Sequence, residues 1–475
     1  MTPEPPHPLE RLFCPRSVAI VGASANSAKQ GHKYLKHLLD YGFKGGIYPV
    51  NPREAEILSV KTYPSVADLP EAPDLVISTI PAESVPELVE DCARRGARFL
   101  HMFTALLSET GIPERKALED RIISRARELG IRVLGPNCMG IYNPAIGLTF
   151  RIVSSTEKGC VALISQSAAH AAEVMYRGWV RGLAFSKVVS YGNAADINET
   201  DLLDYLAGDP ETKVILAYIE GIKGRGFREI LKKAASTKPV AIFKVGRTPA
   251  GVRAAASHTG SLAGSYQVWQ GMMRQSRVIT ADSLDELVDL GIVFGKLPPP
   301  GGRNVGAAGA GGGGSIVAAE EFETNGLAML PFPLDLVESL KPVVGEGWYL
   351  MKNPIDASIV AEAGIGYARI GAMMRLMASH PLYHILCWDL GEWRPNGPEE
   401  AALYRSMVDV LIATHHEVKK PLAAVLRPAD HLHEWRWRLA IETQQKCARE
   451  GLAVFPSVTR AAVALGKLTD YYSQI

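Results

Sequence analysis

The chain has 475 residues, of which 47% are hydrophobic and 21% are charged, and its 51 basic and 50 acidic residues leave a formal net charge of +1. This near-neutral balance lacks the basic field that drives nucleic-acid binding, and no segment approaches the roughly 18 unbroken apolar residues of a membrane-spanning helix. At about 150 residues per domain, the length predicts about three domains and no membrane association.

The start of the chain and its cysteines indicate a cytoplasmic protein. Residues 1–17 carry prolines and acidic side chains where a secretion signal needs a basic region followed by a long apolar run. The six cysteines are scattered without CxxC spacing, so the sequence predicts neither a disulfide framework nor a zinc site. The histidines match no compact set of metal ligands, and we expect no metal bound by this chain alone.

Residues 1–143 are predicted to form one doubly wound α/β domain of the Rossmann type. Residues 17–26, SVAIVGASAN, give a short apolar run rich in β-branched residues, then a Gly/Ser turn that leads toward a helix. The further strands are expected at 46–50, 75–80, 99–103 and 133–134, and the helices at 85–95 and 114–129. The domain is expected to end near Asn143.

The rest of the chain reads as two copies of a flavodoxin-like doubly wound unit, at 144–300 and 301–475. The first copy opens on the strand CVALIS, and the second follows the proline- and glycine-rich link LPPPGG. The segments AFSKVVSYGNAAD and KVILAYIEG of the first copy have loose counterparts in LMKNPIDAS and YHILCWDLG of the second. An internal duplication is the simplest interpretation.

The loops of the first domain favour a ligand that contains ADP. The turn VGAS lacks the full GxGxxG pattern, and residues 48–53, YPVNPR, offer no carboxylate for the ribose of a nicotinamide dinucleotide. A lone strand–Gly–helix start fits either a nucleotide-type ligand or plain fold architecture. The loops VNP, TIPAES and GPNCMG are all expected at carboxyl ends of parallel strands, where such ligands bind.

The two copies differ at one place, which singles out His258. Between its last two strands the first copy inserts RTPAGVRAAASHTGSLAGSYQVWQ, where the second has a helix-like segment without glycine. The small neighbours of His258 let another group approach its imidazole. A neutral imidazole nitrogen can attack a phosphoryl group and later release it, so His258 is a candidate covalent relay. A loop histidine that makes one hydrogen bond to the backbone is the alternative.

Two further features fit phosphoryl chemistry. Glu220 ends the apolar strand of AYIEG, where its carboxylate could orient an imidazole, although it could equally serve as a capping or salt-bridging group. The segments SQSAA at 165–169 and GGGGS at 311–315 read as helix starts, whose free backbone N–H groups and positive dipole ends hold phosphate. Tight strand–helix packing is the competing explanation for each of these two loops.

Taken together, these motifs resemble the α subunit of the ADP-forming acetyl-CoA synthetases and, more distantly, of succinyl-CoA ligase. The resemblance covers almost the whole chain, and its motifs occur in order. The specific ones are SHTGSLAG and the stretch from SYGNAADINETDLLDYLAGDP to YIEG, whereas the glycine turns are common to many folds.

The resemblance implies the CoA-binding subunit of an NDP-forming acyl-CoA ligase. Such an enzyme converts a carboxylic acid, CoA and ATP or GTP into acyl-CoA, ADP or GDP, and phosphate, through acyl phosphate and phosphohistidine. His258 would be the phosphorylated histidine and Glu220 its support. The implied phosphate-binding residues are Ser165, Gln166, Ser167, Ala168, Gly313, Gly314 and Ser315. The implied CoA-binding residues are Gly22, Ala23, Ser24, Val50, Asn51, Pro52, Thr79, Ile80, Pro81 and Asn137.

The family's nucleotide site lies in an ATP-grasp domain, and no stretch of this sequence resembles one. The resemblance therefore implies an ATP-grasp β subunit that brings Mg-ATP or Mg-GTP, and a hetero-oligomer. The chain departs from the family pattern at Ala168 and Tyr266, where a Gly and often an Asp are usual, and at residues 105–106, where a Gly-Phe pair is usual. A non-catalytic CoA-sensing or scaffold protein is thus the main alternative, and a nicotinamide-linked oxidoreductase is the third hypothesis.

Overall fold

The computed structural model describes residues 6–150, 155–253, 266–309, 311–346, 348–356, 366–391, 398–427 and 433–474. The chain divides into two compact units. Unit 1 comprises Met1–Trp179 and Ala184–Leu287, and unit 2 comprises Val180–Leu183 and Val288–Ile475. Within the described ranges, no helix has the length and apolar character that crossing a membrane requires.

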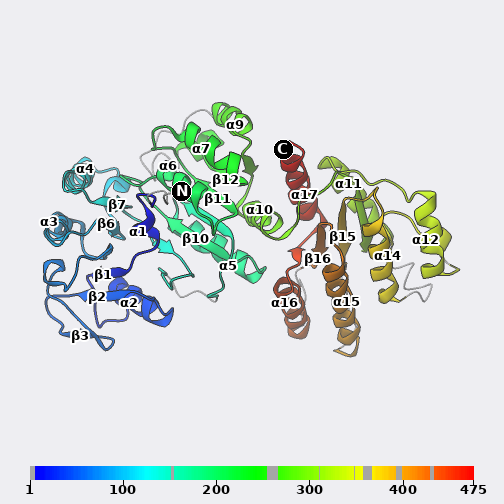
Figure 1. The fold of residues 1–475 in the computed structure, drawn as a ribbon, viewed down its shortest axis with the longest axis horizontal. Coiled ribbons are helices and arrows are strands. Elements are labelled where there is room, and N and C mark those ends of the chain that lie inside the picture. Colours follow the sequence, from blue (N-terminus) through cyan, green and yellow to red (C-terminus); the bar gives the residue numbers. More distant parts are fainter. Residues whose placement is uncertain are drawn as a thin grey trace, which may run out of the picture. The chain divides into compact units, whose positions relative to one another are not determined.

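The first sheet of unit 1 is fully parallel, in the order β2-β1-β5-β6-β7 (blue to cyan in Figure 1). Its order reverses between β1 and β5, which creates a crevice at the carboxyl ends of these two strands. The strands are β1 (Ser17–Val21), β2 (Gly46–Val50), β5 (Leu75–Ser78), β6 (Phe99–Met102) and β7 (Arg132–Leu134), with the small hairpin of β3 (Glu56–Ile57) and β4 (Val60–Lys61). The α-helices are α1 (Glu10–Phe13), α2 (Gln30–Asp40), α3 (Val85–Arg95) and α4 (Pro113–Glu128).

The second sheet of unit 1 has the order β13-β12-β11-β9-β10-β8, and only β8 runs antiparallel to its neighbour. Without β8 this is the flavodoxin order 2-1-3-4-5, which reverses between β9 and β11. The strands are β8 (Gly140–Tyr142), β9 (Val161–Ser165), β10 (Phe185–Ser190), β11 (Val214–Ile219), β12 (Val240–Lys244) and β13 (Ile279–Ala281). The helices are α5 (Ala168–Val180), α6 (Glu199–Gly208), α7 (Phe227–Thr237) and α9 (Tyr266–Gln275). The helix α10 (Leu284–Lys296) begins in unit 1 and continues into unit 2 after Leu287.

Unit 2 is built on the parallel sheet β14-β15-β16-β17. Ile355 forms a parallel bridge to Ala308 of β14, so the NPID segment takes the place that β10 has beside β9. Figure 1 shows α11 and α17 on one side of this sheet and α14, α15 and α16 on the other. The elements are β14 (Val305–Gly309), α11 (Gly311–Thr324), α12 (Leu334–Val344), α14 (Tyr367–Ser379), β15 (Ile385–Asp389), α15 (Pro398–Glu417), β16 (Leu422–Val425), α16 (Glu434–Arg449), β17 (Ala453–Phe455) and α17 (Val458–Tyr472). The predicted fold class, a Rossmann-like domain followed by flavodoxin-like domains, is confirmed.

The cores follow from the composition of the strands. Every residue of β1, β9, β11 and β14 is buried, as expected for parallel strands that helices cover on both faces. The buried polar side chains are exceptions to this pattern, and several of them stand at or just beyond strand ends: Ser78, Ser165, Gln166, Glu220, Lys244 and Asp389. The ends of the strands are therefore the places where the fold buries polar side chains that could bind or react.

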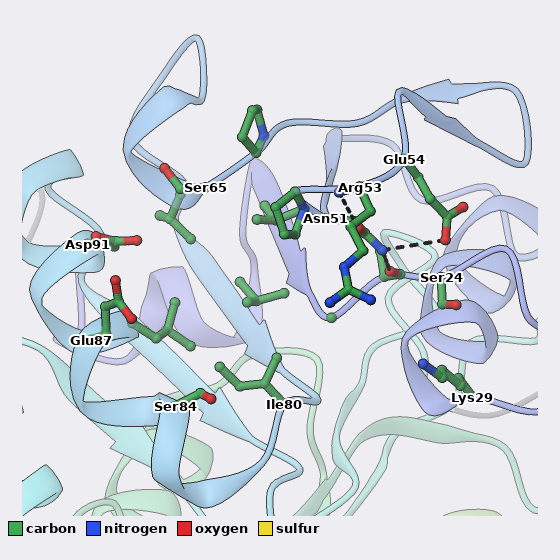
Figure 2. A pocket seen from close by; sticks show the side chains of 18 residues that line it. Ser24, Lys29, Asn51, Arg53, Glu54, Ser65, Ile80, Ser84, Glu87 and Asp91 are labelled. Carbon is green, nitrogen blue, oxygen red and sulfur yellow. Dashed lines mark hydrogen bonds between the residues drawn. The ribbon is translucent and has the colours of Figure 1, made fainter.

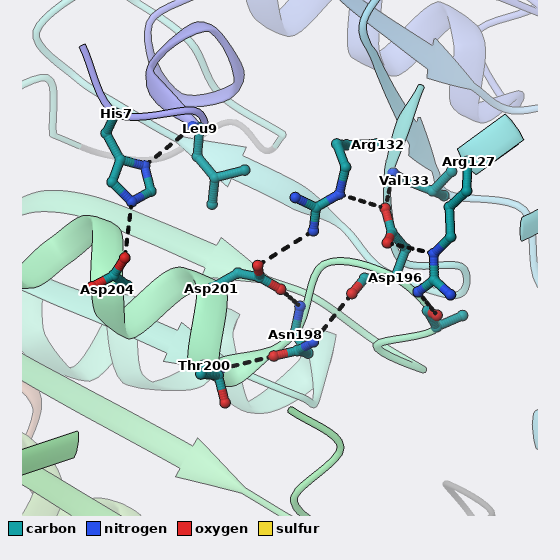
Figure 3. Close-up of polar contacts among 11 residues, drawn as sticks. His7, Leu9, Arg127, Arg132, Val133, Asp196, Asn198, Thr200, Asp201 and Asp204 are labelled. Carbon is teal, nitrogen blue, oxygen red and sulfur yellow. Dashed lines mark hydrogen bonds and ion pairs between the residues drawn. The ribbon is translucent and has the colours of Figure 1, made fainter. Parts of the chain in front are cut away.

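Asp196, in the loop after β10, joins the two sheets of unit 1 (Figure 3). Its carboxylate, 5% exposed, accepts hydrogen bonds at 2.9 Å from Nε of Arg127 and at 2.9 Å from Nε of Arg132. The backbone N–H of Val133 donates to the same carboxylate at 2.8 Å. Arg132 also reaches Asp201 of α6 at 3.3 Å. This network ties α4 and β7 of the first sheet to the start of α6 in the second.

His101 of β6 makes the stability of the first sheet sensitive to acid. The residue is 2% exposed, and its Nε2 lies 3.1 Å from the carbonyl oxygen of Cys138, to which it donates. Burial lowers the pKa of His101 from 6.5 to about 4. The pKa of His101 is therefore lower in the folded state than in the unfolded chain. For this reason its contribution to the free energy of unfolding is complete above pH 6.5 and is lost as the pH falls toward about 4. The expected loss is about 3 kcal/mol.

We expect His101→Gln, whose amide can donate to the same carbonyl, to abolish this acid-dependent part of stability. The measurement is the unfolding midpoint by circular dichroism at pH values from 7 to 4, for wild type, His101→Gln and the exposed control His416→Gln. The difference between His101→Gln and wild type should shrink as the pH falls. Parallel curves over this range would show that His101 does not carry the effect.

Candidate functional site

A cavity of 440 Å³ lies at the reversal point of the first sheet, at the carboxyl ends of β1 and β5. Such crevices are where open α/β sheets bind ligands. The lining residues come from the turns after β1, β2 and β5, from the segment before η1 (Val66–Asp68) and from α3. They are Val21, Gly22, Ala23, Ser24, Lys29, Val50, Asn51, Pro52, Arg53, Glu54, Pro64, Ser65, Val66, Ile80, Ser84, Glu87, Leu88 and Asp91.

Gly22 and Asn51 shape the turns that form this cavity. Gly22 has φ +89°, and a Cβ there would lie 2.6 Å from Oγ1 of Thr79, so only glycine fits. The Asn51 amide donates to the carbonyl oxygen of Ala23 at 2.7 Å, and its carbonyl oxygen accepts from the N–H of Arg53 at 2.8 Å. Asn51 therefore holds the turn after β1 against the turn after β2.

Charged side chains line both sides of the cavity, as Figure 2 shows. Lys29 and Arg53 lie on the side of Ser24, whereas Glu87 and Asp91 of α3 lie on the opposite side. Glu54, one residue beyond the segment in which we expected no carboxylate, also lines the cavity and accepts from the N–H of Ala25 at 3.2 Å. A ligand with anionic groups fits the side of the two cations.

Seven of the ten residues predicted to bind CoA line the cavity, and Thr79, Pro81 and Asn137 do not. The Thr79 hydroxyl donates to the carbonyl oxygen of Val21 at 3.0 Å, which turns it into the loop rather than toward the cavity. Asn137 faces the second sheet, with its amide 3.4 Å from the side-chain oxygen of Asn193.

Around Asn193 the two sheets of unit 1 share a polar junction. Nδ2 of Asn193 donates to Glu109 at 2.7 Å and to Glu119 at 3.0 Å, and Nζ of Lys223 donates to the Asn193 carbonyl at 2.8 Å. Burial lowers the pKa of Lys223, against the charges of Glu119 and Glu199. Through Lys223 this junction is continuous with the loop that follows Glu220.

Gln166, Glu220 and Lys244 meet at the carboxyl ends of β9, β11 and β12, beside the reversal point of the second sheet. Oε1 of Gln166 accepts from the backbone N–H of Glu220 and, at 2.9 Å, from that of Gly221. Nζ of Lys244 donates to the backbone carbonyl of Glu220 at 2.8 Å. The backbone of Glu220 is therefore held from both neighbouring strands, and the residue as a whole is only 6% exposed.

The start of α5 lies next to Gln166. Oγ of Ser167 accepts from the N–H of His170 at 3.3 Å, and Oγ of Ser165 donates to the carbonyl of Ser167 at 2.7 Å. Ser167 thus caps the helix that begins at Ala168, and the first-turn N–H groups have no intrahelical partner. Nε2 of buried Gln166 has no hydrogen-bond partner within the described chain. Backbone and side-chain donors are therefore available to an anion at this strand end.

Unit 2 repeats part of this arrangement. Gly313, Gly314 and Ser315 lie in the first turns of α11, which begins at Gly311. Asp389 is the last residue of β15, whereas Glu220 comes directly after the last residue of β11. Nη2 of Arg427 lies 3.4 Å from the carboxylate of Asp389. Burial raises the pKa of Asp389, against the Gly391 N–H and the Arg427 charge.

His258 lies outside the described residues, and Tyr266 is the first residue of α9. No three His, Cys, Asp or Glu side chains in the described parts of the chain lie close enough to hold a metal ion together.

The first doubly wound domain, with its polar crevice, and the flavodoxin-like sheet that follows it each match a known protein family. A family model described as a CoA binding domain matches residues 16–144, and one described as a succinyl-CoA ligase like flavodoxin domain matches residues 158–294.

Relatives that are named as acetate–CoA ligases match most of this chain. The acetate–CoA ligase [ADP-forming] I subunit alpha of Pyrococcus furiosus is 36% identical, over 97% of both chains. The acetate–CoA ligase [ADP-forming] I of Archaeoglobus fulgidus is 40% identical over 73% of this chain and 50% of its own length. A solved chain of the dinucleotide forming acetyl-coenzyme A synthetase 1 of Ca. Korarchaeum cryptofilum, in complex with phosphate and ADP, superposes with a TM-score of 0.85. It is 32% identical, over 98% of this chain and 97% of that chain.

The chain belongs to the family of α subunits of ADP-forming acetyl-CoA synthetases, which are acid–thiol ligases with CoA as a substrate. These matches favour the ligase over the non-catalytic CoA-sensing or scaffold protein.

Several side chains of the first-sheet cavity and of the strand end around Glu220 were not predicted from the sequence. Lys29, Arg53, Ser65 and the carboxylates of α3 line the cavity, and Tyr218 and Lys244 adjoin Glu220. A lysine at the end of an otherwise apolar strand such as VAIFK is a detectable signal, because lysine is rarely buried unless paired. The α3 residues gave no local signal, because they look like any exposed helical face.

Proposed function

We propose that this chain is the CoA-binding and phosphohistidine-carrying subunit of an ADP-forming acyl-CoA ligase, with His258 as the phosphorylated residue and Glu220 as its support. The observation that carries the proposal is buried Glu220, whose backbone is held by Gln166 and Lys244 at the strand end next to the N-terminus of α5. A fixed carboxylate orients an imidazole, and a helix N-terminus stabilises phosphate.

The proposed reaction has three steps. An imidazole nitrogen of His258 takes the γ-phosphoryl group of ATP and releases ADP. A carboxylate oxygen of the acid then attacks the phosphorus, which gives acyl phosphate and frees the imidazole. The CoA thiol, losing its proton, attacks the acyl carbon and expels phosphate. Each step is reversible, so the same residues serve the direction that makes ATP. The acid is proposed to be a small carboxylic acid, as in the acetate–CoA ligases named above.

We place the nucleotide site on a partner subunit with an ATP-grasp domain, which binds Mg-ATP. The Pyrococcus relative is named as an α subunit, and this chain spans about half the length of the single-chain Archaeoglobus relative. Both facts support a second polypeptide or domain that completes the enzyme. GTP in place of ATP is less favoured, because these relatives are named as ADP-forming.

The cavity of the first sheet is the proposed site of the ADP portion of CoA. The N–H groups of the Gly22–Ser24 turn are suited to a pyrophosphate, and the cations of Lys29 and Arg53 to its charge. Lys29 and Arg53 form no ion pair within the described residues, so both are available to phosphate groups.

We therefore expect the isolated chain to bind CoA saturably in titration calorimetry and to show no binding of NAD. Arg53→Ala should weaken CoA binding about 10- to 100-fold, the effect of removing a hydrogen bond to a charged group. The matched control is Arg121→Ala on the exposed face of α4, which should bind CoA like wild type. Saturable NAD binding without a CoA signal would contradict the assignment. An Arg53→Ala variant with unchanged affinity would move the phosphates elsewhere.

A further inference from the structure

Glu199, the first residue of α6, reaches the loop that begins at Glu220. Its Oε1 accepts hydrogen bonds from the backbone N–H of Lys223 at 2.6 Å and from that of Gly224 at 2.7 Å. The residue is fully buried, at 0% exposure. Hydrogen bonds to a carboxylate are shorter and stronger than those between neutral groups, so Glu199 holds the far end of this loop firmly.

Gly224 packs against the start of α6. A Cβ at this glycine would lie 2.0 Å from Oγ1 and 2.5 Å from Cβ of Thr200, and 2.4 Å from Oδ1 of Asn198. A side chain of any size would therefore clash, and only glycine lets the loop approach the helix so closely. This steric fit and the hydrogen bonds of Glu199 are two independent signs that the loop is docked on the first turn of α6.

The helix does not need Glu199 as a cap. Oδ1 of Asn198 accepts from the N–H of Thr200 at 3.0 Å, and the Asp201 carboxylate accepts from the N–H of Asn198 at 3.1 Å. Asn198 and Asp201 form the capping box of α6. Oε2 of Glu199 has no hydrogen-bond partner within the described chain. The hydrogen bonds from the loop to Oε1 therefore offset the cost of burying this carboxylate.

The loop of residues 220–224 is held at both ends. Gln166 and Lys244 hold its first end, as described above, and Glu199 holds its last end. Without the second anchor the loop could move while β11 stays in place. Glu220 lies between the strand and the rest of the loop, and the backbone torsions of a residue restrict the directions that its side chain can take. The direction of the Glu220 side chain therefore depends on both anchors.

We propose that Glu199 is a positioning residue for phosphoryl transfer, which holds the loop of Glu220 against α6. The inference rests on the proposed function of Glu220. Glu199 contacts neither substrate nor phosphate in this proposal and acts only through the backbone of the loop.

The pair of variants Glu199→Ala and Glu199→Gln tests the proposal, because glutamine keeps the accepting Oε1 and alanine removes it. In the complex with the ATP-grasp partner, we expect Glu199→Ala to lower kcat about 10- to 100-fold, the effect of a misplaced catalytic group, with KM for CoA unchanged. The rate at which γ-labelled ATP labels the chain should fall by the same factor. Glu199→Gln should turn over and be labelled close to wild type.

Gly224→Ala tests the same contact without a change to the carboxylate, and it decides the question if Glu199→Ala does not fold. Its added methyl group should push the loop away from α6, so kcat and labelling should fall as in Glu199→Ala. The matched glycine control is Gly208→Ala at the end of α6, where an added Cβ would meet no atom within 4 Å. Asp201→Ala removes part of the capping box, so it should lower the unfolding midpoint and leave kcat unchanged.

The outcomes separate the role of Glu199 from that of Glu220. Normal turnover of Glu199→Ala or of Gly224→Ala, beside a slow Glu220→Gln, would overturn the role of Glu199 alone. Slow turnover of Glu199→Gln would also overturn it, and so would an Asp201→Ala variant as slow as Glu199→Ala. Normal turnover of Glu220→Gln would overturn the role of Glu220, and the inference with it.

Discussion

Replacement of His258 by alanine is expected to abolish ATP-dependent acyl-CoA formation while folding and CoA affinity stay close to wild type. The reason is that the proposed relay breaks without a nucleophile, whereas the sequence predicts His258 on a Gly/Ser-rich segment that contributes little to packing. Removing one member of a unit that acts together costs nearly the whole rate, so we expect a loss of at least about 10³-fold in kcat.

The measurement is made on the complex with the ATP-grasp partner, incubated with γ-labelled ATP and Mg²⁺, or run in reverse from acyl-CoA, ADP and labelled phosphate. Wild type should carry acid-labile, base-stable label on this chain, and His258→Ala should carry none. His433→Ala, at the N-cap of α16 in unit 2, is the control and should be labelled normally. If His258→Ala is labelled and turns over normally, the relay lies elsewhere and the non-catalytic alternative regains its place.

Among the substitutions proposed, replacement of Lys187 by methionine is expected to cause the largest loss in the free energy of unfolding. Nζ of Lys187, whose side chain is 1% exposed, lies 2.8 Å from the carboxylates of Asp209 and Glu211. Burial lowers the pKa of Lys187, but the hydrogen bonds to Asp209 and Glu211 outweigh it, so the pKa lies above the ordinary 10.5. Methionine keeps the apolar stem but leaves Asp209, whose side chain is 5% exposed, without its main cation. A broken buried pair of this kind costs about 3–5 kcal/mol.

Because the chain has more than one unit, the loss is best measured locally, as faster amide hydrogen exchange in peptides that cover β10 and α6. Lys233→Met, which breaks a more exposed pair with Asp204, should cost at most about 1 kcal/mol. Adding Asp209→Leu to Lys187→Met should recover part of the loss, since apolar groups then replace both charges. Because the pKa of Lys187 is raised in the folded state, the contribution of this ion pair to stability is complete below pH 10.5. It is lost as the pH rises through the folded pKa. Unchanged exchange in Lys187→Met would refute the assignment.

The sequence alone determined the fold class and the family. Runs such as VAIVG, CVALIS and KVILAYIEG are apolar and β-branched because parallel strands are covered on both faces, and each ends at a small-residue turn. The expected strands agree with the structure to within one or two residues. Gly22 and Glu220 were predicted for the same reason, because each is the residue that stops an apolar run. These features are local, so the linear order of residues contains them.

Only the tertiary structure decided which side chains meet at those turns. Neighbouring strand ends in the order β12-β11-β9 come from segments far apart in the chain, so the contact of Lys244 and Gln166 with Glu220 is invisible in the sequence. The direction of a side chain within a turn is equally hidden. Thr79 bonds back to Val21 while Ile80 lines the cavity, and Asn137 turns toward Asn193. Such choices depend on hydrogen bonds between elements that the fold must first bring together.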